Sequence, residues 1–246
     1  MIAILPMAFS SRAVVPALIK PSRRMVDMKF TCARPWLSVE LGSVHQVLSW
    51  TLNAPGFIET DRVVWREVRN SDLTPELDAH QWLLQELQRS NNAQAVAFLT
   101  SRNIDFHHYA EKSIEGEKVS CLVTAGLSNA ERVGVRHGPQ NRFGTINILV
   151  KTISHLSQAA MIELMSVVVQ ARTLAVLEAD IKIGAHQQAA TGTGTDCVAI
   201  ASPLRGAAAP CIYAGLHTAI AEAAGVAVLS AMHEALTIWK KNHLNP

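Results

Sequence analysis

One stretch of the chain, residues 189–225, gathers most of the side chains that could carry out hydrolysis. It contains a Gly/Thr run that ends at Asp196, then His217, and further on the carboxylate of Glu222. Glycine and threonine ahead of an apolar run are typical of a tight turn, which would place Asp196 at the edge of a strand. His217 and Glu222 fall at or just inside a predicted helix N-terminus, where backbone N–H groups point outward. An acid, a histidine, hydroxyls and free N–H donors so close together could hydrolyse a bond.

The order of the elements around Gly192–Gly194 disfavours a phosphate-binding loop. Dinucleotide fingerprints and P-loops follow a strand, open a helix, and carry either a third glycine or a lysine. Here Gly192–Gly194 precedes the apolar run Val198–Ala201, no lysine follows it, and the third glycine is absent. Nucleotide binding is therefore disfavoured, and the alternative for Gly192–Asp196 is a plain β-turn without chemistry.

The composition bounds the class of protein. A chain of 246 residues suits one large domain or two small ones, and it can bury a sizeable core. Apolar residues make up 49%, charged residues 17%, and the net charge is +2. This balance gives no reason to expect nucleic acid or an anionic membrane as a partner. The low charge and the many alanines and glycines suggest closely packed helices and leave a homo-oligomer open.

Cysteine usage and the N-terminal residues indicate a cytoplasmic location. The four cysteines form no C-x-x-C pair, so we expect reduced, mostly buried thiols rather than disulfides or a zinc site. The sequence contains no uninterrupted apolar run of about 18 residues, so we expect no membrane-spanning helix. Met1–Phe9 lacks the basic start of a secretory signal, and we expect residues 1–30 to be a loose tail before a single domain over residues 31–246.

Hydrophobic periodicity predicts alternating strands and helices. The fold class is therefore α/β or α+β, a single domain with a mixed sheet flanked by helices, and the strand order is not predicted. The expected strands cover Ser38–Leu52, Arg62–Val68, Ala95–Thr100, Lys118–Thr124, Thr145–Lys151 and Val198–Ala201, and the expected helices cover Thr74–Ser90, Asp105–Lys112, Ser157–Asp180 and Thr218–Lys240.

Three further features have both a structural and a functional interpretation. Ser128 with Glu131 forms a capping-box pattern after a strand, where open sheets also place ligands. Trp50 and Trp65 could stack on a flat ligand, but tryptophan in an apolar strand is more typical of the core. Cys197 should alternate to the side of the strand opposite Asp196, which favours the core over a nucleophilic role.

Three motifs stand in order along the chain: Thr124–Ala130, Ala190–Asp196 and Tyr213–Thr218. In this order and spacing they resemble the adenosylcobinamide amidohydrolase family, over roughly residues 38–235. The resemblance implies cleavage of the amide that joins the aminopropanol arm to the corrin ring of adenosylcobinamide, giving adenosylcobyric acid for cobalamin salvage. The partner would then be a small corrinoid substrate. Ser49–Gly56 and Val169–Arg172 depart from the family pattern.

Amide hydrolysis needs an activated water or nucleophile, an oxyanion stabiliser and an acid for the leaving amine. Our hypothesis gives Asp196 and His217 the orienting and base roles. Asn129, with the backbone N–H groups near Ser128, would stabilise the oxyanion. Glu222 could be a second carboxylate or a first-turn acid favoured by the helix dipole, and His217 could equally be structural.

The remaining candidates are hydroxyl groups, which could be nucleophiles or could bind substrate. They belong to Ser128, Thr191, Thr193 and Thr195. No H-x-x-x-H pair supports a metal site, and no cofactor is expected. The alternatives are a corrinoid-binding protein without catalysis, and an amidase for a different small amide. Contact between Asp196 and His217 beside a wide cleft would favour the enzyme.

Overall fold

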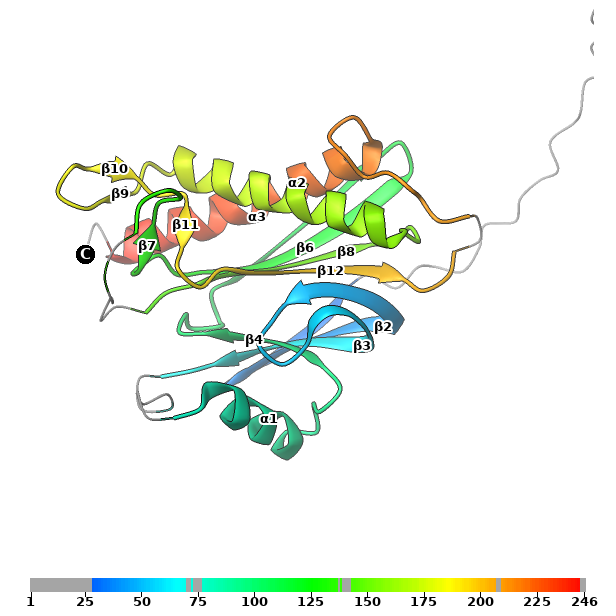
Figure 1. Cartoon of the computed structure of the whole chain (residues 1–246), viewed down its shortest axis with the longest axis horizontal. Coiled ribbons are helices and arrows are strands. Elements are labelled where there is room, and N and C mark those ends of the chain that lie inside the picture. The colour runs from blue at the N-terminus through cyan, green and yellow to red at the C-terminus, as the bar shows by residue number, and fades with distance from the viewer. Residues whose placement is uncertain are drawn as a thin grey trace, which may run out of the picture.

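Helices and strands of the chain stack in the order helix, sheet, sheet, helix (Figure 1). The computed structural model describes residues 28–69, 72, 77–136, 138, 143–206 and 209–243. Both strand layers belong to one eight-stranded sheet with the order β4-β3-β2-β12-β8-β6-β5, in which β1 also pairs with β2. The predicted class, a mixed sheet flanked by helices, is confirmed.

The first strand layer comes from the N-terminal part of the chain. It consists of β1 (Lys29–Ala33), β2 (Trp36–Trp50), β3 (Pro55–Glu67) and β4 (Val96–Thr100), and it is covered by α1 (Ala79–Arg89). The strands β2 and β3 form an antiparallel hairpin, and β4 runs parallel to β3. Leu83 and Leu87 of α1 pack with Val64 and Ala97 in a small core beneath this layer.

The second strand layer carries the two long helices. It consists of β5 (His107–Ile114), β6 (Glu117–Ala125), β8 (Ile146–Thr152) and β12 (Cys197–Pro203), and the helices are α2 (Gln158–Glu178) and α3 (Ala219–His243). The helix α2 lies in the crossover between the parallel strands β8 and β12. Short pairs complete the layer: β7 (Ala130–Glu131) with β11 (Gly192–Thr193), and β9 (Lys182–Ile183) with β10 (Gln188–Ala189).

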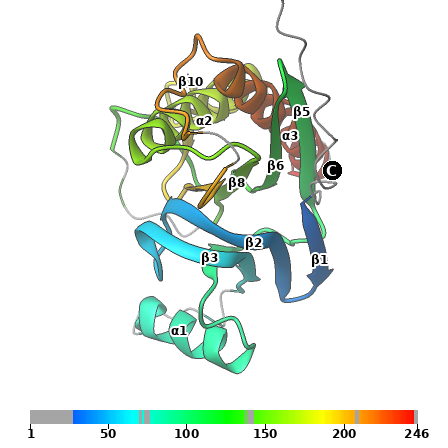
Figure 2. The same cartoon turned by 90° about the vertical axis from the view of Figure 1, so that its right-hand side faces the viewer.

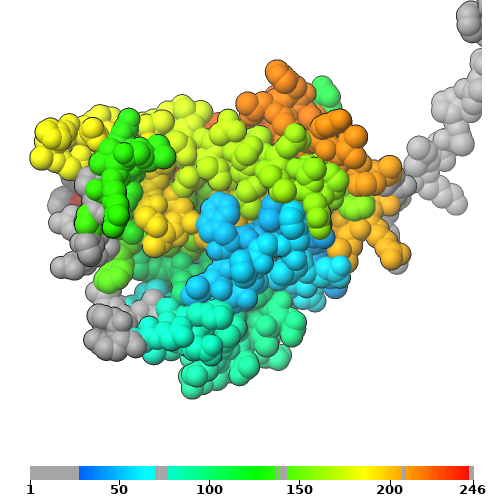
Figure 3. Space-filling view, in the orientation of Figure 1, coloured from blue at the N-terminus to red at the C-terminus, as the bar shows by residue number. Residues whose placement is uncertain are grey.

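The long strand β2 joins the two layers. Its register against β3 shifts between Glu40 and His45, where Gly42 adopts a φ of 84° that other residues rarely tolerate. The half before this bulge pairs with β1, and the half after it pairs with β12. The sheet therefore turns back on itself, as the curved β2 in Figure 2 shows, and its two halves lie against each other in Figure 3.

Alternation along the strands divides the core between the layers. Leu122, Leu149 and Ala199 point between the two strand layers, where Trp65 and Phe98 meet with ring centroids 4.6 Å apart. The neighbouring residues Val123, Ile148 and Val198 on the same strands point toward α2 and α3. There they build the larger core with helix residues such as Leu164 and Val228. This division decides which side chains can reach a space between the layers.

The two long helices are confirmed. The prediction over Ser157–Asp180 corresponds to α2, which Ser157 caps by accepting a hydrogen bond from the Ala160 N–H at 3.2 Å. The prediction over Thr218–Lys240 corresponds to α3. By length and composition both helices could span a membrane, but 50% and 56% of their most apolar windows are buried against the rest of the chain. Packing on the sheet accounts for their apolar character.

The helix predicted over Asp105–Lys112 is wrong. This segment belongs to β5, which pairs with β6 from His107 opposite Thr124 to Ile114 opposite Glu117. The hairpin turns at Glu115 and Gly116, whose φ values are 49° and 89°. A two-residue turn with positive φ at both positions matches the right-handed twist of a hairpin. The Glu-Gly dipeptide was therefore the sequence signal for a hairpin that the helix prediction overlooked.

The helix start predicted from the Ser128 and Glu131 pattern is also wrong. The Ala130 N–H donates to the Leu127 carbonyl at 3.1 Å, and the chain then enters β7 rather than a helix. Pairing with β11 outcompetes the local capping pattern, because it supplies backbone partners from a distant loop.

The N-terminal boundary also differs from the prediction of a tail over residues 1–30. Met28 is buried, and Lys29 and Phe30 belong to β1. Residues 1–27 lie outside the described residues. The Phe30 ring contacts His107 with centroids 5.2 Å apart, so β1 joins the two layers at their second edge.

The helix start predicted at Thr74–Glu76 lies outside the described residues. The helix α1 begins at Ala79, after Asp78, whose carboxylate accepts from the N–H groups of His80 and Gln81. An acid at this position satisfies backbone donors that have no partner within the helix. The prediction of a helix here is confirmed, over a shorter span.

Candidate functional site

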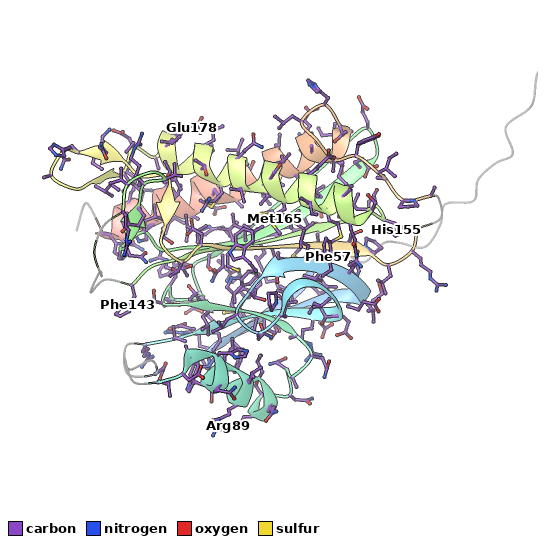
Figure 4. The ribbon with its side chains drawn as sticks, viewed as in Figure 1. Phe57, Arg89, Phe143, His155, Met165 and Glu178 are labelled. Carbon is purple, nitrogen blue, oxygen red and sulfur yellow. The ribbon has the colours of Figure 1, made fainter. Side chains whose placement is uncertain are left out.

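A cavity of about 570 Å³ opens at one end of the molecule, between the two strand layers. The end of β4 and the turn after β2 line it from the first layer, and the starts of β8 and β12 line it from the second. Phe143, on its wall, marks this end in Figure 4, and His155 marks the opposite end. Its polar lining residues are Thr51, Thr100, Ser101, Asn129, Thr145, Asn147, Thr195 and Asp196.

The carboxylate of Asp196 is fully engaged by neighbouring groups. Its Oδ2 accepts from Arg172 Nη1 and from the Thr193 N–H at 3.0 Å. Its Oδ1 accepts from the Thr193 hydroxyl and from the Ile146 N–H at 3.1 Å. A carboxylate offers about four acceptor positions, so these donors fill them. Asp196 therefore anchors the loop to β8 and α2, and its side chain is not a free base.

Steric crowding explains why position 192 of this motif is a glycine. A Cβ on Gly192 would lie 2.5 Å from Asp196 Oδ2 and 2.8 Å from Arg172 Nη1. Both distances are closer than non-bonded atoms approach, so a larger residue would separate the ion pair. Only 14% of the Arg172 side chain and 5% of the Asp196 side chain are exposed. The run from Gly192 to Asp196 is thus a cradle for a buried ion pair, and sequence reasoning missed Arg172 as its partner.

The first two sequence motifs meet at the cavity. The Thr191 N–H donates to the Glu131 carbonyl at 2.8 Å, and the Thr191 hydroxyl accepts from the Val133 N–H at 2.8 Å. These bonds continue the pairing of β7 with β11. The hydroxyls of Thr191 and Thr193 are thus occupied in holding the loops together, and only Thr195 among the predicted threonines lines the cavity.

Gly144 lets the loop of the first motif approach β8. A Cβ at this position would lie 2.6 Å from the Gly126 carbonyl oxygen and 2.8 Å from both Asn129 Oδ1 and Ser128 N. Asn129 consequently reaches the cavity wall, and its buried Oδ1 has no hydrogen-bond partner among the residues that the structure describes. The Thr195 hydroxyl donates to the Gly144 carbonyl at 3.0 Å, which brings Thr195 and Asn129 to the same glycine.

The structure does not bring Asp196 and His217 together. The segment that contains His217 follows the far end of β12 and is tied to α2 near its start, where the Ala214 N–H donates to Glu163 at 2.7 Å. The Cys211 N–H donates to the carbonyl of His155, at the end of the molecule opposite the cavity. His217 is exposed there. The predicted dyad of Asp196 and His217 is therefore absent from this geometry.

The groups around His217 form an ordinary helix start. Thr218 caps α3, since its hydroxyl accepts from the Ala221 N–H at 3.3 Å. Glu222 is an exposed acid in the first turn, where the helix dipole favours a negative charge. Neither His217 nor Glu222 lines the cavity. The structural interpretation of both residues fits their positions.

Cys197 lines the cavity and also belongs to the core between the strand layers. Burial raises the pKa of its thiol to about 12, so at neutral pH the thiol is protonated and a poor nucleophile. All four cysteines are free, and Cys121 is buried as well, whereas Cys211 is partly exposed and Cys32 exposed. The predicted free thiols are confirmed, but only two of the four are buried.

Ionisable groups are scarce around the cavity. Among its described lining residues, Asp196 and Cys197 are the two with ionisable side chains. Within the described ranges, no group of three or more histidine, cysteine, aspartate or glutamate side chains is placed to hold a metal ion. The arrangement offers hydroxyl and carboxamide groups, which suit hydrogen bonding to an uncharged amide.

Trp50 is a cavity residue that sequence reasoning assigned to the core. It is 45% exposed and lines the cavity, whereas Trp65 is fully buried, as expected. The Trp50 Nε1–H donates to the carbonyl of Asp196 at 2.8 Å. Its position at the very end of β2, directly before a turn, was the signal that could have separated it from a core tryptophan.

A family model described as adenosylcobinamide amidohydrolase (CbiZ) matches residues 20–244. The chain therefore belongs to this family. An uncharacterized protein of Methanocaldococcus jannaschii is 33% identical over 157 residues, which cover 56% of this chain and 60% of that protein. The chain thus spans less than two thirds of the length of this curated relative.

Solved structures with a similar arrangement are more distant. A beta-aminopeptidase of a Burkholderia species aligns with a TM-score of 0.42 at 14% identity, over 83% of this chain and 78% of its own. A Pyrococcus horikoshii protein aligns with a TM-score of 0.41 at 12% identity, over 82% of this chain and 77% of its own.

Proposed function

We propose that the chain hydrolyses the amide between a corrin side chain and the aminopropanol arm of adenosylcobinamide, releasing adenosylcobyric acid and aminopropanol. The observation that carries this proposal is the cavity itself. Two of the three motifs by which the chain resembles its family, Thr124–Ala130 and Ala190–Asp196, build one wall of it. Family membership over residues 20–244 supplies the reaction class, and the uncharged polar lining suits an amide substrate.

Thr195 and Asn129 are the side chains best placed to act on the amide. Thr195 is exposed and lines the cavity, and its hydroxyl would be either the nucleophile or the group that positions a water. Attack on the carbonyl carbon forms a C–O bond, the C–N bond then breaks, and the amine takes the proton that the attacking hydroxyl or water loses. Where Thr195 is the nucleophile, a water molecule then hydrolyses the ester to Thr195 and releases the acid. The Asn129 carboxamide lines the same cavity and, like Thr195, lies next to Gly144, and its NH2 group would stabilise the developing oxyanion. Asp196 would act by fixing the loop.

A second candidate function is corrinoid binding without hydrolysis. It is favoured by the separation of Asp196 from His217 and by the four hydrogen bonds that occupy the Asp196 carboxylate. With these groups engaged, no described side chain at the cavity is a free general base. A protein that only binds would need the cavity but not a base.

Incubation of the purified protein with adenosylcobinamide, followed by chromatography and mass spectrometry, separates the two functions. We expect adenosylcobyric acid and free aminopropanol. Thr195→Ala should lower the rate by at least about 100-fold, since a positioned catalytic group typically contributes that much. His217→Ala is the control and should leave the rate unchanged. Unaltered corrinoid that co-elutes with the protein would favour binding, and a corrinoid that neither reacts nor co-elutes would exclude both.

A further inference from the structure

Three large apolar side chains surround the mouth of the cavity. Trp50, Leu52 and Phe143 are 45%, 47% and 55% exposed, and they come from the end of β2, the turn that follows it and the segment before β8. The deeper lining differs, because the polar Thr100 and Asn147, each only 1% exposed, lie there beside the equally buried apolar Ala97 and Phe98. The mouth of the cavity is therefore apolar, and its floor adds polar groups.

The Trp50 ring is held in one orientation. Its N–H, the only polar group of the side chain, donates to the Asp196 carbonyl at 2.8 Å. That carbonyl belongs to the loop anchored by the ion pair between Asp196 and Arg172. The hydrogen-bonding need of the indole is thus met within the protein, so its exposed surface offers an apolar face. A face fixed in advance loses little side-chain freedom when a ligand covers it.

We propose that Trp50, Leu52 and Phe143 form the subsite for the macrocycle of the substrate, while the polar floor takes its amide arm. This inference rests on the proposed function and assigns the ring to a place in the cavity. A corrinoid has broad apolar ring faces and carries amide-terminated arms at its periphery. The apolar ring would therefore meet the apolar mouth of the cavity, and a projecting amide arm would reach the polar groups of its floor.

The concave setting distinguishes this patch from other exposed apolar residues. Ile162 and Leu174 of α2 are 56% and 45% exposed, but neither lines the cavity. At the mouth, a flat ligand can touch all three apolar side chains and still extend an arm inward. A second copy of the chain could also cover these exposed apolar residues, and binding measurements on Trp50 variants distinguish a second copy from a corrinoid ring.

The test measures binding of adenosylcobyric acid, which has the ring but lacks the aminopropanol arm. By equilibrium dialysis, Trp50→Ala should raise the Kd at least about tenfold, because aromatic residues dominate such contacts. Trp50→Phe loses the same hydrogen bond but keeps a ring, and it should retain most of the affinity. Leu52→Ala should raise the Kd about threefold, while its matched control, Leu174→Ala on α2, should leave it unchanged.

Kinetics with adenosylcobinamide give a second readout. We expect Trp50→Ala and Leu52→Ala at the mouth to raise KM more than they lower kcat, because the contact with the corrin ring exists before and during the reaction. If wild-type protein cleaves adenosylcobinamide but Trp50→Ala and Trp50→Phe both keep the wild-type Kd, the ring subsite is overturned and the proposed function stands. If wild-type protein binds no corrinoid, both are overturned. Dissociation of a dimer by Trp50→Ala at unchanged Kd would assign the patch to a second copy.

Discussion

The two ends of β12 look alike in sequence and differ in structure. Before the strand, the Gly/Thr run ends at Asp196, and after it a run of small residues leads to His217 and Thr218. The first segment closes over a buried ion pair at the cavity, whereas the second is an exposed entry to α3. Both contain residue types that catalysis uses, yet only the first segment lies where a ligand can be enclosed.

The difference follows from what α2 brings to each end. Near its middle, α2 presents Arg172 to Asp196, and the pair is buried. Near its start, α2 presents Glu163 to the backbone N–H of Ala214, which fixes the segment without engaging His217. An acid or a histidine interacts strongly with a charged partner only when another element supplies that partner and excludes water from the pair. Four predictions test this contrast.

The largest effect is expected for the buried ion pair. Asp196→Ala should lower the free energy of unfolding by about 3–5 kcal/mol, because it leaves Arg172 charged and unpaired in a buried site. Urea denaturation followed by circular dichroism measures this. Glu222→Ala, at the other end of β12, is the control and should cost about 0.3–1 kcal/mol. Equal losses in the two variants would contradict the contrast.

The next effect concerns the glycine that admits this pair. Gly192→Ala should destabilise the protein by about 1–3 kcal/mol, because the new Cβ forces Asp196 and Arg172 apart. Gly194→Ala is a matched control two positions along, where the nearest atom to a Cβ is 3.9 Å away, at Glu131. Thermal unfolding of both variants measures this difference. Equal melting temperatures would show that the buried ion pair does not require a glycine at position 192.

The far end of β12 should contribute a pH dependence. His45 pairs there with Pro203, and burial lowers its pKa, with a smaller opposite effect from its bond to the Ser43 carbonyl. Below about pH 6.5 the unfolded chain therefore binds a proton that folded His45 resists. Stability should fall as the pH drops through this value and level off below the folded pKa.

The control for this dependence is His45→Gln, which removes the titrating ring and can keep a hydrogen bond to Ser43. Urea midpoints measured between pH 8 and pH 5 should fall less in this variant than in the wild-type protein. The buried His108, whose pKa burial also lowers, should supply part of the slope that remains. An identical slope in both proteins would show that His45 contributes nothing.

The smallest effect is expected for His217. His217→Ala should change the free energy of unfolding by no more than about 0.5 kcal/mol, since the side chain is exposed. The rate of corrinoid hydrolysis should stay within a factor of two. A loss of activity with normal stability would place the catalytic chemistry at the end of β12 opposite the cavity, and the cavity would need another role.

Local patterns in the sequence predicted much of the fold. The helices α2 and α3 follow from long apolar periodicity, and β6 and β8 from short apolar runs between turn residues. The helix prediction over Asp105–Lys112 is wrong because the polar and apolar residues of this segment suit either a helix or an exposed edge strand. Pairing with β6 decides between them, and such pairing depends on residues elsewhere in the chain.

The site was predicted only in part, for a similar reason. Asp196, Asn129 and Thr195 were found because Gly/Thr turns next to apolar strands are recognisable from sequence. Arg172 was not assigned to the site, since it lies on a helix 24 positions away and only the crossover geometry brings it to Asp196. The prediction of Trp50 as a core residue rests on the apolar strand that contains it and overlooks its position at the end of β2, directly before a turn.

The hydrogen bond from Trp50 to Asp196 also bears on when the site first exists. It joins residues 146 positions apart, so it depends on closing a very long loop. A chain synthesised only as far as β8 already contains Trp50 and the floor residue Asn147. It still lacks the carbonyl that orients the indole and the strand that completes the wall. The pocket therefore arises late in synthesis, and a fragment that ends before β12 should not bind a ligand there, however well its first hairpin folds.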